Sequence, residues 1–151
     1  MILSTKLTND ILVHLGIMAV PQTPSIPFID SLIHAYCRTV PWESAFRIVR
    51  RAAVTNPTNC PRWPDQFWRE AIQKGSGGTC FESNYAVLTL LQALGIDGYL
   101  TINNMEDSIG CHSAIIIWLA GQKWLVDVGF PLYAPLPISP HGTMYRSSEF
   151  L

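Results

Sequence analysis

The chain has 151 residues and a mass of 16.9 kDa, which is enough for one domain with a substantial buried core. Hydrophobic residues make up 48% of it and charged residues 14%, a balance that excludes intrinsic disorder. Ten Lys and Arg residues against eleven Asp and Glu residues leave a net charge of −1, which argues against a nucleic-acid partner. No apolar run reaches the roughly eighteen residues that spanning a bilayer requires, so we expect no membrane partner. The four cysteines include no CxxC pair, which predicts reduced thiols, no metal site and a cytoplasmic protein.

The first part of the chain has the spacing of short helices. A first helix is expected after the capping candidates Thr8 and Asn9, with Gly16 placed to end it. Apolar residues at helical spacing over 29–36 predict a second helix, which must end before Pro41.

Three more segments continue this pattern. Residues 46–51 predict a third helix, whereas the prolines and asparagines of 55–64 indicate a loop. Residues 65–74 have an acidic start and a basic end, as the helix dipole prefers. The glycine-rich turn GSGGTC, residues 75–80, then leads into an apolar helix over 81–94.

The second part of the chain changes character. Segments 98–103, 112–119 and 122–130 are short and rich in β-branched and aromatic residues, which predicts strands. We therefore expect an α+β fold in which an N-terminal helical bundle packs on a small antiparallel sheet or partial barrel. Residues 1–95 form the helical part, and residues 96–151 form the β part with a proline-rich tail, together in one compact unit.

The predicted hairpin brings two polar residues together. If Ala120 and Gly121 form a two-residue turn, Asp127 lies opposite Ala114 and is the diagonal neighbour of His112 on the same face. A carboxylate in that position orients an imidazole and stabilises its cationic form. A three-residue loop would instead send Asp127 to the opposite face. Such residues at strand ends also often serve only to satisfy backbone groups.

Cys80 is the candidate nucleophile. It lies at the mouth of a helix directly after the glycines, where unpaired N–H groups and the helix dipole favour the thiolate. The glycine N–H groups are candidates to receive a developing oxyanion. Together with an imidazole and a carboxylate, such a thiol performs acyl transfer through a thioester. Two alternatives stay open: a free cysteine is most often a small buried residue, and a glycine-rich turn before a helix more often binds phosphate. Cys111 points to the opposite strand face from His112, and we expect it to pack in the core.

Three blocks in this order, TVPWESA, GGTCFESN and HSAIIIWLAGQKWLVDVGF, resemble the signature blocks of the arylamine N-acetyltransferases. The family's catalytic Cys, His and Asp fall on Cys80, His112 and Asp127. The resemblance implies a cysteine-protease-like core and a ping-pong reaction. In that reaction the cysteine takes an acetyl group from acetyl-CoA and passes it to an arylamine or arylhydrazine. Acetyl-CoA is then a co-substrate, and no bound cofactor is expected.

The resemblance also implies binding residues. Trp42 and Phe130 match positions that line the acceptor pocket, and Ser108 falls where the family contacts coenzyme A. Two features depart from the family pattern. Ser76 stands where the second block begins with Arg, which removes a charge that helps to fix the loop. The chain is also about half the usual length, without the C-terminal lid, so we expect uncovered strand edges to favour self-association.

Two other functions fit the same residues. A transglutaminase-like cysteine hydrolase or amide synthase uses the same triad with water or another amine as acceptor. An inactive partial module, whose role is association, is the third reading.

Overall fold

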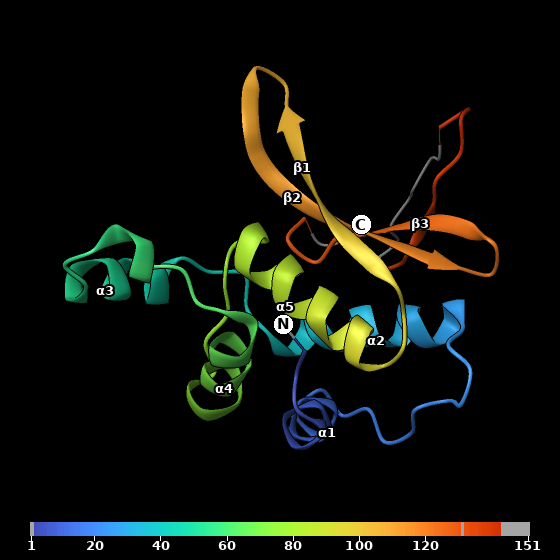
Figure 1. Ribbon diagram of the computed structural model, residues 1–151, viewed down its shortest axis with the longest axis horizontal. Helices are drawn as coiled ribbons and strands as arrows, with labels where there is room; N and C mark the ends of the chain where they lie inside the picture. The colour runs from blue at the N-terminus through green and yellow to red at the C-terminus, as the bar shows by residue number, and fades with distance from the viewer. Residues whose placement is uncertain (1, 131, 143–151) are drawn as a thin grey trace.

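A computed structural model of the chain describes residues 2–130 and 132–142 (Figure 1). Within these residues, five α-helices and one 3-10 turn precede a four-stranded antiparallel sheet of order β1-β2-β3-β4. This arrangement confirms the predicted α+β fold, with the helices first and the sheet last. The elements are α1 (Thr5–His14), α2 (Ile26–Thr39), α3 (Ala45–Ala53), η1 (Pro57–Asn59), α4 (Pro64–Lys74), α5 (Cys80–Ala93), β1 (Gly98–Met105), β2 (Ser108–Leu119), β3 (Gln122–Val126) and β4 (Leu136–Pro137).

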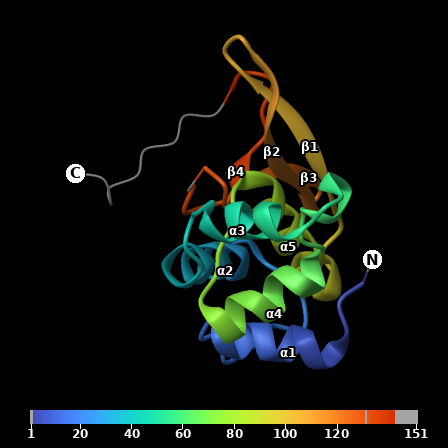
Figure 2. The same ribbon diagram turned by 90° about the vertical axis from the view of Figure 1, so that its left-hand side faces the viewer.

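Helix α5 is the centre of the molecule. The strands lie on one side of it, and α1, α2 and α4 lie on the other (Figures 1 and 2). Most of its residues are buried, among them Leu90 and Leu91, because it packs against β1 and β2 and also against α4 and α1. Among the residues that the structure describes, no helix combines the length and the apolar character that crossing a membrane requires.

The β2–β3 hairpin has the predicted two-residue turn. Ala120 and Gly121 both have positive φ angles, 53° and 77°, as the hairpin turns that match strand twist require. Leu119 pairs with Gln122, and the same register continues to Ile115 opposite Val126. Asp127 follows directly after the last paired residue of β3, as the predicted register requires.

The predicted start of the first helix is wrong. Helix α1 begins at Thr5, and its N-cap is Ser4, whose hydroxyl accepts a hydrogen bond from the Leu7 N–H at 3.3 Å. Thr8 lies inside the helix and donates its hydroxyl to the Ser4 carbonyl. A serine one turn earlier therefore provides the cap, while Gly16, with φ of 72°, follows the end of the helix as predicted.

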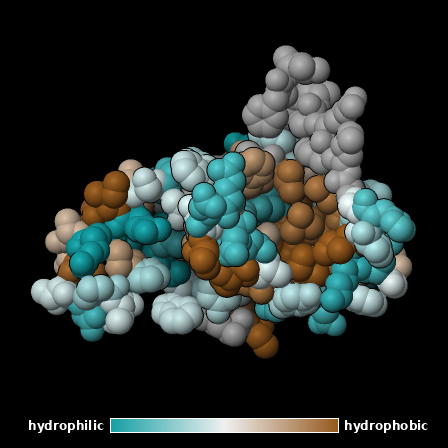
Figure 3. Space-filling model, turned by 90° about the horizontal axis from the view of Figure 1, so that it is seen from above, coloured by the Kyte–Doolittle hydropathy of each residue, from teal (hydrophilic) through white to brown (hydrophobic). Residues whose placement is uncertain are grey.

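Helix α3 lies at the edge of the molecule. None of its residues is buried, and Ile48 and Val49 are mostly exposed. Seen from above, apolar side chains gather at this end of the molecule (Figure 3). The β1–β2 hairpin likewise rises away from the helices (Figure 1), and its β1 strand forms one edge of the sheet.

Candidate active site

Cys80 is the first residue of α5. Its cap residue, Thr79, makes no side-chain cap hydrogen bond, and the N–H groups of a first helical turn have no carbonyl partner within the helix. The thiol is half-buried, and its Sγ lies 3.9 Å from the carbonyl oxygen of Cys111, the residue before His112. The helix mouth therefore presents the Cys80 thiol to strand β2.

His112 and Asp127 are in direct contact. His112 lies on β2, and its Nε2 is 2.5 Å from Oδ2 of Asp127. The Asp127 side chain is buried, while the imidazole keeps 13% of its surface exposed. The contact that the hairpin register predicted between these two side chains is thus present, and the carboxylate orients the imidazole ring.

The second carboxylate oxygen of Asp127 organises the turn that follows it. Oδ1 accepts hydrogen bonds from the backbone N–H groups of Gly129 and Phe130, both at 2.9 Å, and from Nδ2 of Asn84 at 3.0 Å. Oδ1 therefore binds the turn and Asn84, and Oδ2 binds His112. This division of partners leaves the carboxylate no freedom to turn away from the imidazole.

Asn84 is a residue of this site that the sequence analysis missed. It lies on α5 one helical turn after Cys80 and is completely buried. Besides its bond to Asp127, its Nδ2 donates to the Ser113 carbonyl at 2.6 Å, and its Oδ1 accepts from the Val128 N–H at 3.0 Å. The signal in the sequence was an amide four residues after the cysteine, on the buried face of an apolar helix.

Gly129 brings the turn after β3 against the nucleophile. A methyl group on Gly129 would lie 2.5 Å from both Cα and Cβ of Cys80, and 3.0 Å from Nδ2 of Asn84. Only a residue without a side chain permits this approach. Cys80 therefore borders the segment that carries Asp127 and, through Cys111, the segment that carries His112.

The glycine loop before Cys80 does not have the role expected of it. The Gly77 N–H donates to Oε1 of Glu43 at 3.2 Å, and the Gly78 N–H donates to the Pro41 carbonyl at 3.3 Å. These groups already have partners, so the expectation that they receive an oxyanion is wrong. The glycines serve close packing instead, since a methyl group on Gly77 would overlap the Pro41 oxygen at 1.6 Å. The N–H groups of the first turn of α5 remain as candidates.

The predicted binding residues divide into two groups. Trp42 is 65% exposed and forms a backbone bridge with Gly78, while Phe130 is 57% exposed and donates its N–H to Asp127. Both aromatic rings therefore come from segments that border Cys80 or Asp127. Ser108 does not, because it lies at the far end of the β1–β2 hairpin, four residues before His112 and beyond the irregularity at Gly110, whose φ is 63°.

Cys111 corrects another expectation. It lies on the opposite strand face from His112, as expected, but it is exposed and does not pack in the core. Residues 104–109 of the same hairpin are exposed as well, so no other element among the described residues packs over this part of the sheet.

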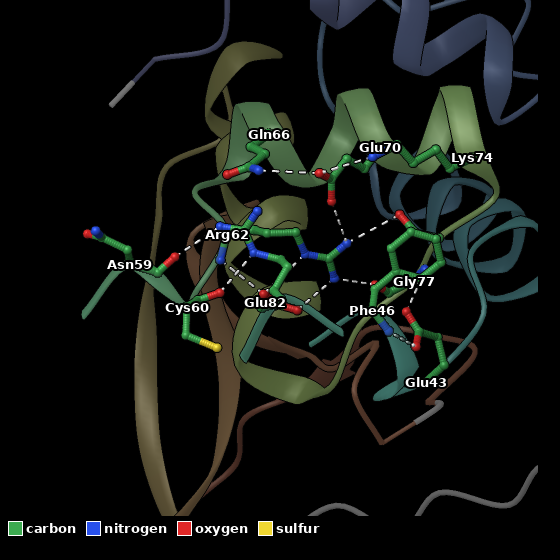
Figure 4. A network of polar contacts seen from close by, with 12 residues as sticks. Glu43, Phe46, Asn59, Cys60, Arg62, Gln66, Glu70, Lys74, Gly77 and Glu82 are labelled. Carbon is green, nitrogen blue, oxygen red and sulfur yellow. Dashed lines mark hydrogen bonds and ion pairs between the residues drawn. The ribbon is translucent and has the colours of Figure 1, made fainter. Parts of the chain in front are cut away.

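A buried cation compensates for the serine at position 76. The Arg62 side chain is fully buried and donates to the Ser76 hydroxyl at 3.2 Å and to the Glu82 carboxylate at 2.7 Å (Figure 4). Burial alone would lower the pKa of Arg62, but the hydrogen bonds and charge of Glu82 and Glu70 outweigh it and raise that pKa. The expectation that the loop loses a fixing charge is therefore wrong, because a different segment supplies it.

Comparisons with known proteins bear on the family and the fold of the chain. A sequence model of the N-acetyltransferase family matches residues 25–147. The chain is similar to proansamycin X synthase of Amycolatopsis mediterranei, with 30% identity over 95 residues that cover 57% of this chain and 36% of that protein.

Solved structures show the same fold. The arylamine N-acetyltransferase of Salmonella typhimurium superposes with a TM-score of 0.74 at 18% identity, covering 93% of this chain and 54% of that one. A Bacillus cereus arylamine N-acetyltransferase, described as having a unique Cys-His-Glu catalytic triad, gives 0.68 at 22% identity, covering 89% of this chain and 54% of that one. This chain thus spans about half the length of the solved structures and about a third of the curated relative.

Proposed function

The chain belongs to the arylamine N-acetyltransferase family, and from that premise we propose that it transfers an acetyl group from acetyl-CoA to an arylamine or arylhydrazine through a thioester on Cys80. The observation that carries the proposal is the 2.5 Å contact between His112 and Asp127 beside the helix mouth where Cys80 lies. A thiol, an imidazole and a carboxylate in this order constitute acyl-transfer machinery.

In the first half of the reaction, His112 accepts the proton of the Cys80 thiol, and Asp127 stabilises the imidazolium that forms. The thiolate attacks the carbonyl carbon of the acetyl group and generates a tetrahedral oxyanion. The N–H groups of the first turn of α5 are the donors best placed for that oxyanion. Collapse of the intermediate breaks the bond to the coenzyme A sulfur, which leaves with the proton from His112, and the acetyl group stays on Cys80.

In the second half, the acceptor amine attacks the thioester carbonyl. His112 takes a proton from the amine nitrogen, the carbon–sulfur bond breaks, and the proton returns from His112 to the Cys80 sulfur as the amide product leaves. The exposed rings of Trp42 and Phe130 offer an aromatic acceptor flat apolar surface beside the reacting atoms. Contact between Ser108 and coenzyme A stays a prediction, because that serine lies at the far end of the β1–β2 hairpin, four residues before His112.

Two further proposals concern the setting of the reaction. A reduced Cys80 is required, which favours the cytoplasm as the location. Self-association through the uncovered edge of β1 also stays a prediction, since an edge strand offers unpaired backbone groups to a second copy.

The direct test is intact-mass measurement of the full chain after incubation with acetyl-CoA alone and then with an arylamine. We expect a gain of one acetyl group that disappears when the amine is added, with N-acetylarylamine as product. Cys80→Ala should gain no acetyl group, whereas Cys111→Ser, the matched control at an exposed cysteine, should behave as the wild type.

Other outcomes point to the other functions. Hydrolysis of amide substrates without any acetyl adduct would favour the cysteine hydrolase or amide synthase. A cooperatively folded chain that forms no adduct with any acyl donor would favour the inactive module. The curated relative that the chain matches is named as a synthase, so acyl donors other than acetyl-CoA belong in the same assay.

A further inference from the structure

Arg62 has an unusual position for a cation. It lies in the loop between η1 and α4, and its side chain has no exposed surface. Its guanidinium donates hydrogen bonds to Glu82, Glu70, the Ser76 hydroxyl and the Gly77 carbonyl (Figure 4). The Cζ atom of the guanidinium also lies 5.0 Å from the centre of the Phe67 ring. Its backbone N–H also donates to Glu82, at 3.0 Å. Burying a charge is costly unless every donor is used, and here the cost is offset by bonds to three separate segments.

The partners of Arg62 bracket the candidate nucleophile. Ser76 and Gly77 lie four and three residues before Cys80, and Glu82 lies two residues after it. The loop carbonyl and the helix carboxylate are therefore joined through one planar guanidinium, a geometry that a single lysine ammonium does not reproduce. The bonds fix the direction in which the loop enters α5, and with it the direction of the Cys80 side chain.

We infer that Arg62 is a positioning residue for Cys80, which holds the 76–79 loop on the first turn of α5 and neutralises Glu82, two residues after Cys80 on the same turn. The inference rests on the proposed function, because it takes Cys80 to be the nucleophile. It assigns to position 62, in a different loop, the guanidinium that the resemblance places at position 76. The two positions are adjacent in space, because Nη1 of Arg62 lies 3.2 Å from the Ser76 hydroxyl.

The balance of charge around the first turn of α5 predicts how the loss of Arg62 changes the reactivity of Cys80. Glu82 and Glu70 are compensated by Arg62 and by Lys74, whose Nζ lies 3.5 Å from Glu70. Without Arg62, the buried Glu82 carboxylate stands uncompensated two residues from Cys80 and opposes formation of the thiolate. Within residues 2–130 and 132–142, the other titratable and charged groups that face this turn or the thiol are Tyr36 from α2, Glu43 before α3, Arg47 from α3 and the His112–Asp127 pair.

The experiment moves the guanidinium from position 62 to position 76. Arg62→Met, Arg62→Lys and the double variant Arg62→Met/Ser76→Arg are compared in the full chain by the rate at which iodoacetamide alkylates Cys80 between pH 5 and 10. We expect Arg62→Met to be alkylated about tenfold more slowly at pH 7, with its half-maximal rate at higher pH than in the wild type. Arg62→Lys should fall between the two. The double variant should recover most of the lost rate and the original pH profile.

Two controls keep the result decisive. Arg69→Met removes an exposed arginine of α4 and should leave the alkylation profile unchanged. If Arg62→Met does not fold, Arg62→Met/Glu82→Gln removes both charges; it should show the wild-type pH profile while its acetyl transfer stays at least about tenfold below the wild type, since the loop is no longer held.

Some outcomes would overturn the inference. Wild-type alkylation rates and pH profile in a folded Arg62→Met variant would do so, and so would a double variant that recovers thermal stability but not reactivity. Alkylation requires no acetyl-CoA, so a wild-type chain that resists acetylation would refute the proposed function while the role of Arg62 is still measured.

Discussion

The two sides of the first turn of α5 hold the same cysteine by different chemistry. On the side of the sheet, a neutral amide, one carboxylate and one imidazole form a chain from Asn84 through Asp127 to His112. On the side of α4, the contacts are ionic, and Arg62 is fully buried between Glu82 and Glu70. The imidazole keeps 13% of its side chain exposed, whereas the guanidinium keeps none. Reactivity needs access for a substrate, so the exposed side suits chemistry and the buried side suits support.

The largest effect is expected from the reactive side. Asp127→Asn removes the charge that stabilises a cationic His112, and we expect acetyl transfer to fall by about 10²- to 10⁴-fold. Single-turnover acetylation of Cys80, followed by intact mass, measures it. Asp127→Glu is the matched variant: it keeps the charge, but one added methylene conflicts with the three N–H groups that fix Oδ1. Wild-type rates in Asp127→Asn would show that this carboxylate plays no part in the chemistry.

The next effect is on stability and comes from Asn84. Asn84→Ala leaves the Val128 N–H and the Ser113 carbonyl buried without their partner, so the free energy of unfolding should fall by about 2–4 kcal/mol. Urea denaturation measures the change. Thr89→Val, on the same helix, removes one local hydroxyl bond to the Ala86 carbonyl and should cost about 1 kcal/mol. Equal losses in both variants would contradict a special role for Asn84.

A smaller effect is expected at Gly129, where a substitution affects both the packing of the turn after β3 and the position of Cys80. Gly129→Ala forces a methyl group against Cys80, and we expect a loss of about 1–3 kcal/mol of stability together with slower acetylation. Gly98→Ala is the matched control, because its methyl group would lie 2.7 Å from the Ile116 carbonyl oxygen, in the sheet and apart from the reactive residues. That variant should lose stability without a change in the acetylation rate of Cys80. Comparable slowing in both would indicate that any loss of stability reduces reactivity.

The smallest effect tests the ionic side through pH. Burial tends to raise the pKa of Glu70, but hydrogen bonds from Gln66 and Arg62, with the charge of Lys74, outweigh it and lower that pKa. A lowered pKa in the folded state contributes stability above the ordinary value of 4.5, and this stability is lost as the pH falls. Glu70→Gln should therefore show a shallower loss of unfolding free energy than the wild type between pH 5 and 3. Glu106→Gln, at an exposed turn, should leave the slope unchanged.

The sequence by itself determined the features that depend on neighbours in the chain. The two-residue turn at Ala120 and Gly121 sets the register of β2 and β3, and the register brings His112 to Asp127. The glycine-rich turn followed by an apolar run places Cys80 at a helix mouth. Both inferences succeeded because turn type and periodicity act over a few residues. The division into residues 1–95 and 96–151 stays a prediction, although α5 ends at Ala93 and β1 begins at Gly98.

Only the tertiary structure decided which groups meet across the chain. Arg62 reaches Glu82 over 20 residues, Asn84 reaches Asp127 over 43, and the glycine N–H groups are taken by Glu43 and Pro41. The spacing of residues along the chain does not predict such partners, because a buried polar group forms its hydrogen bond with whichever segment packs against it. For the same reason, the exposure of Cys111 depended on whether another element packs over its face of the hairpin, and residues 104–109 beside it are exposed too.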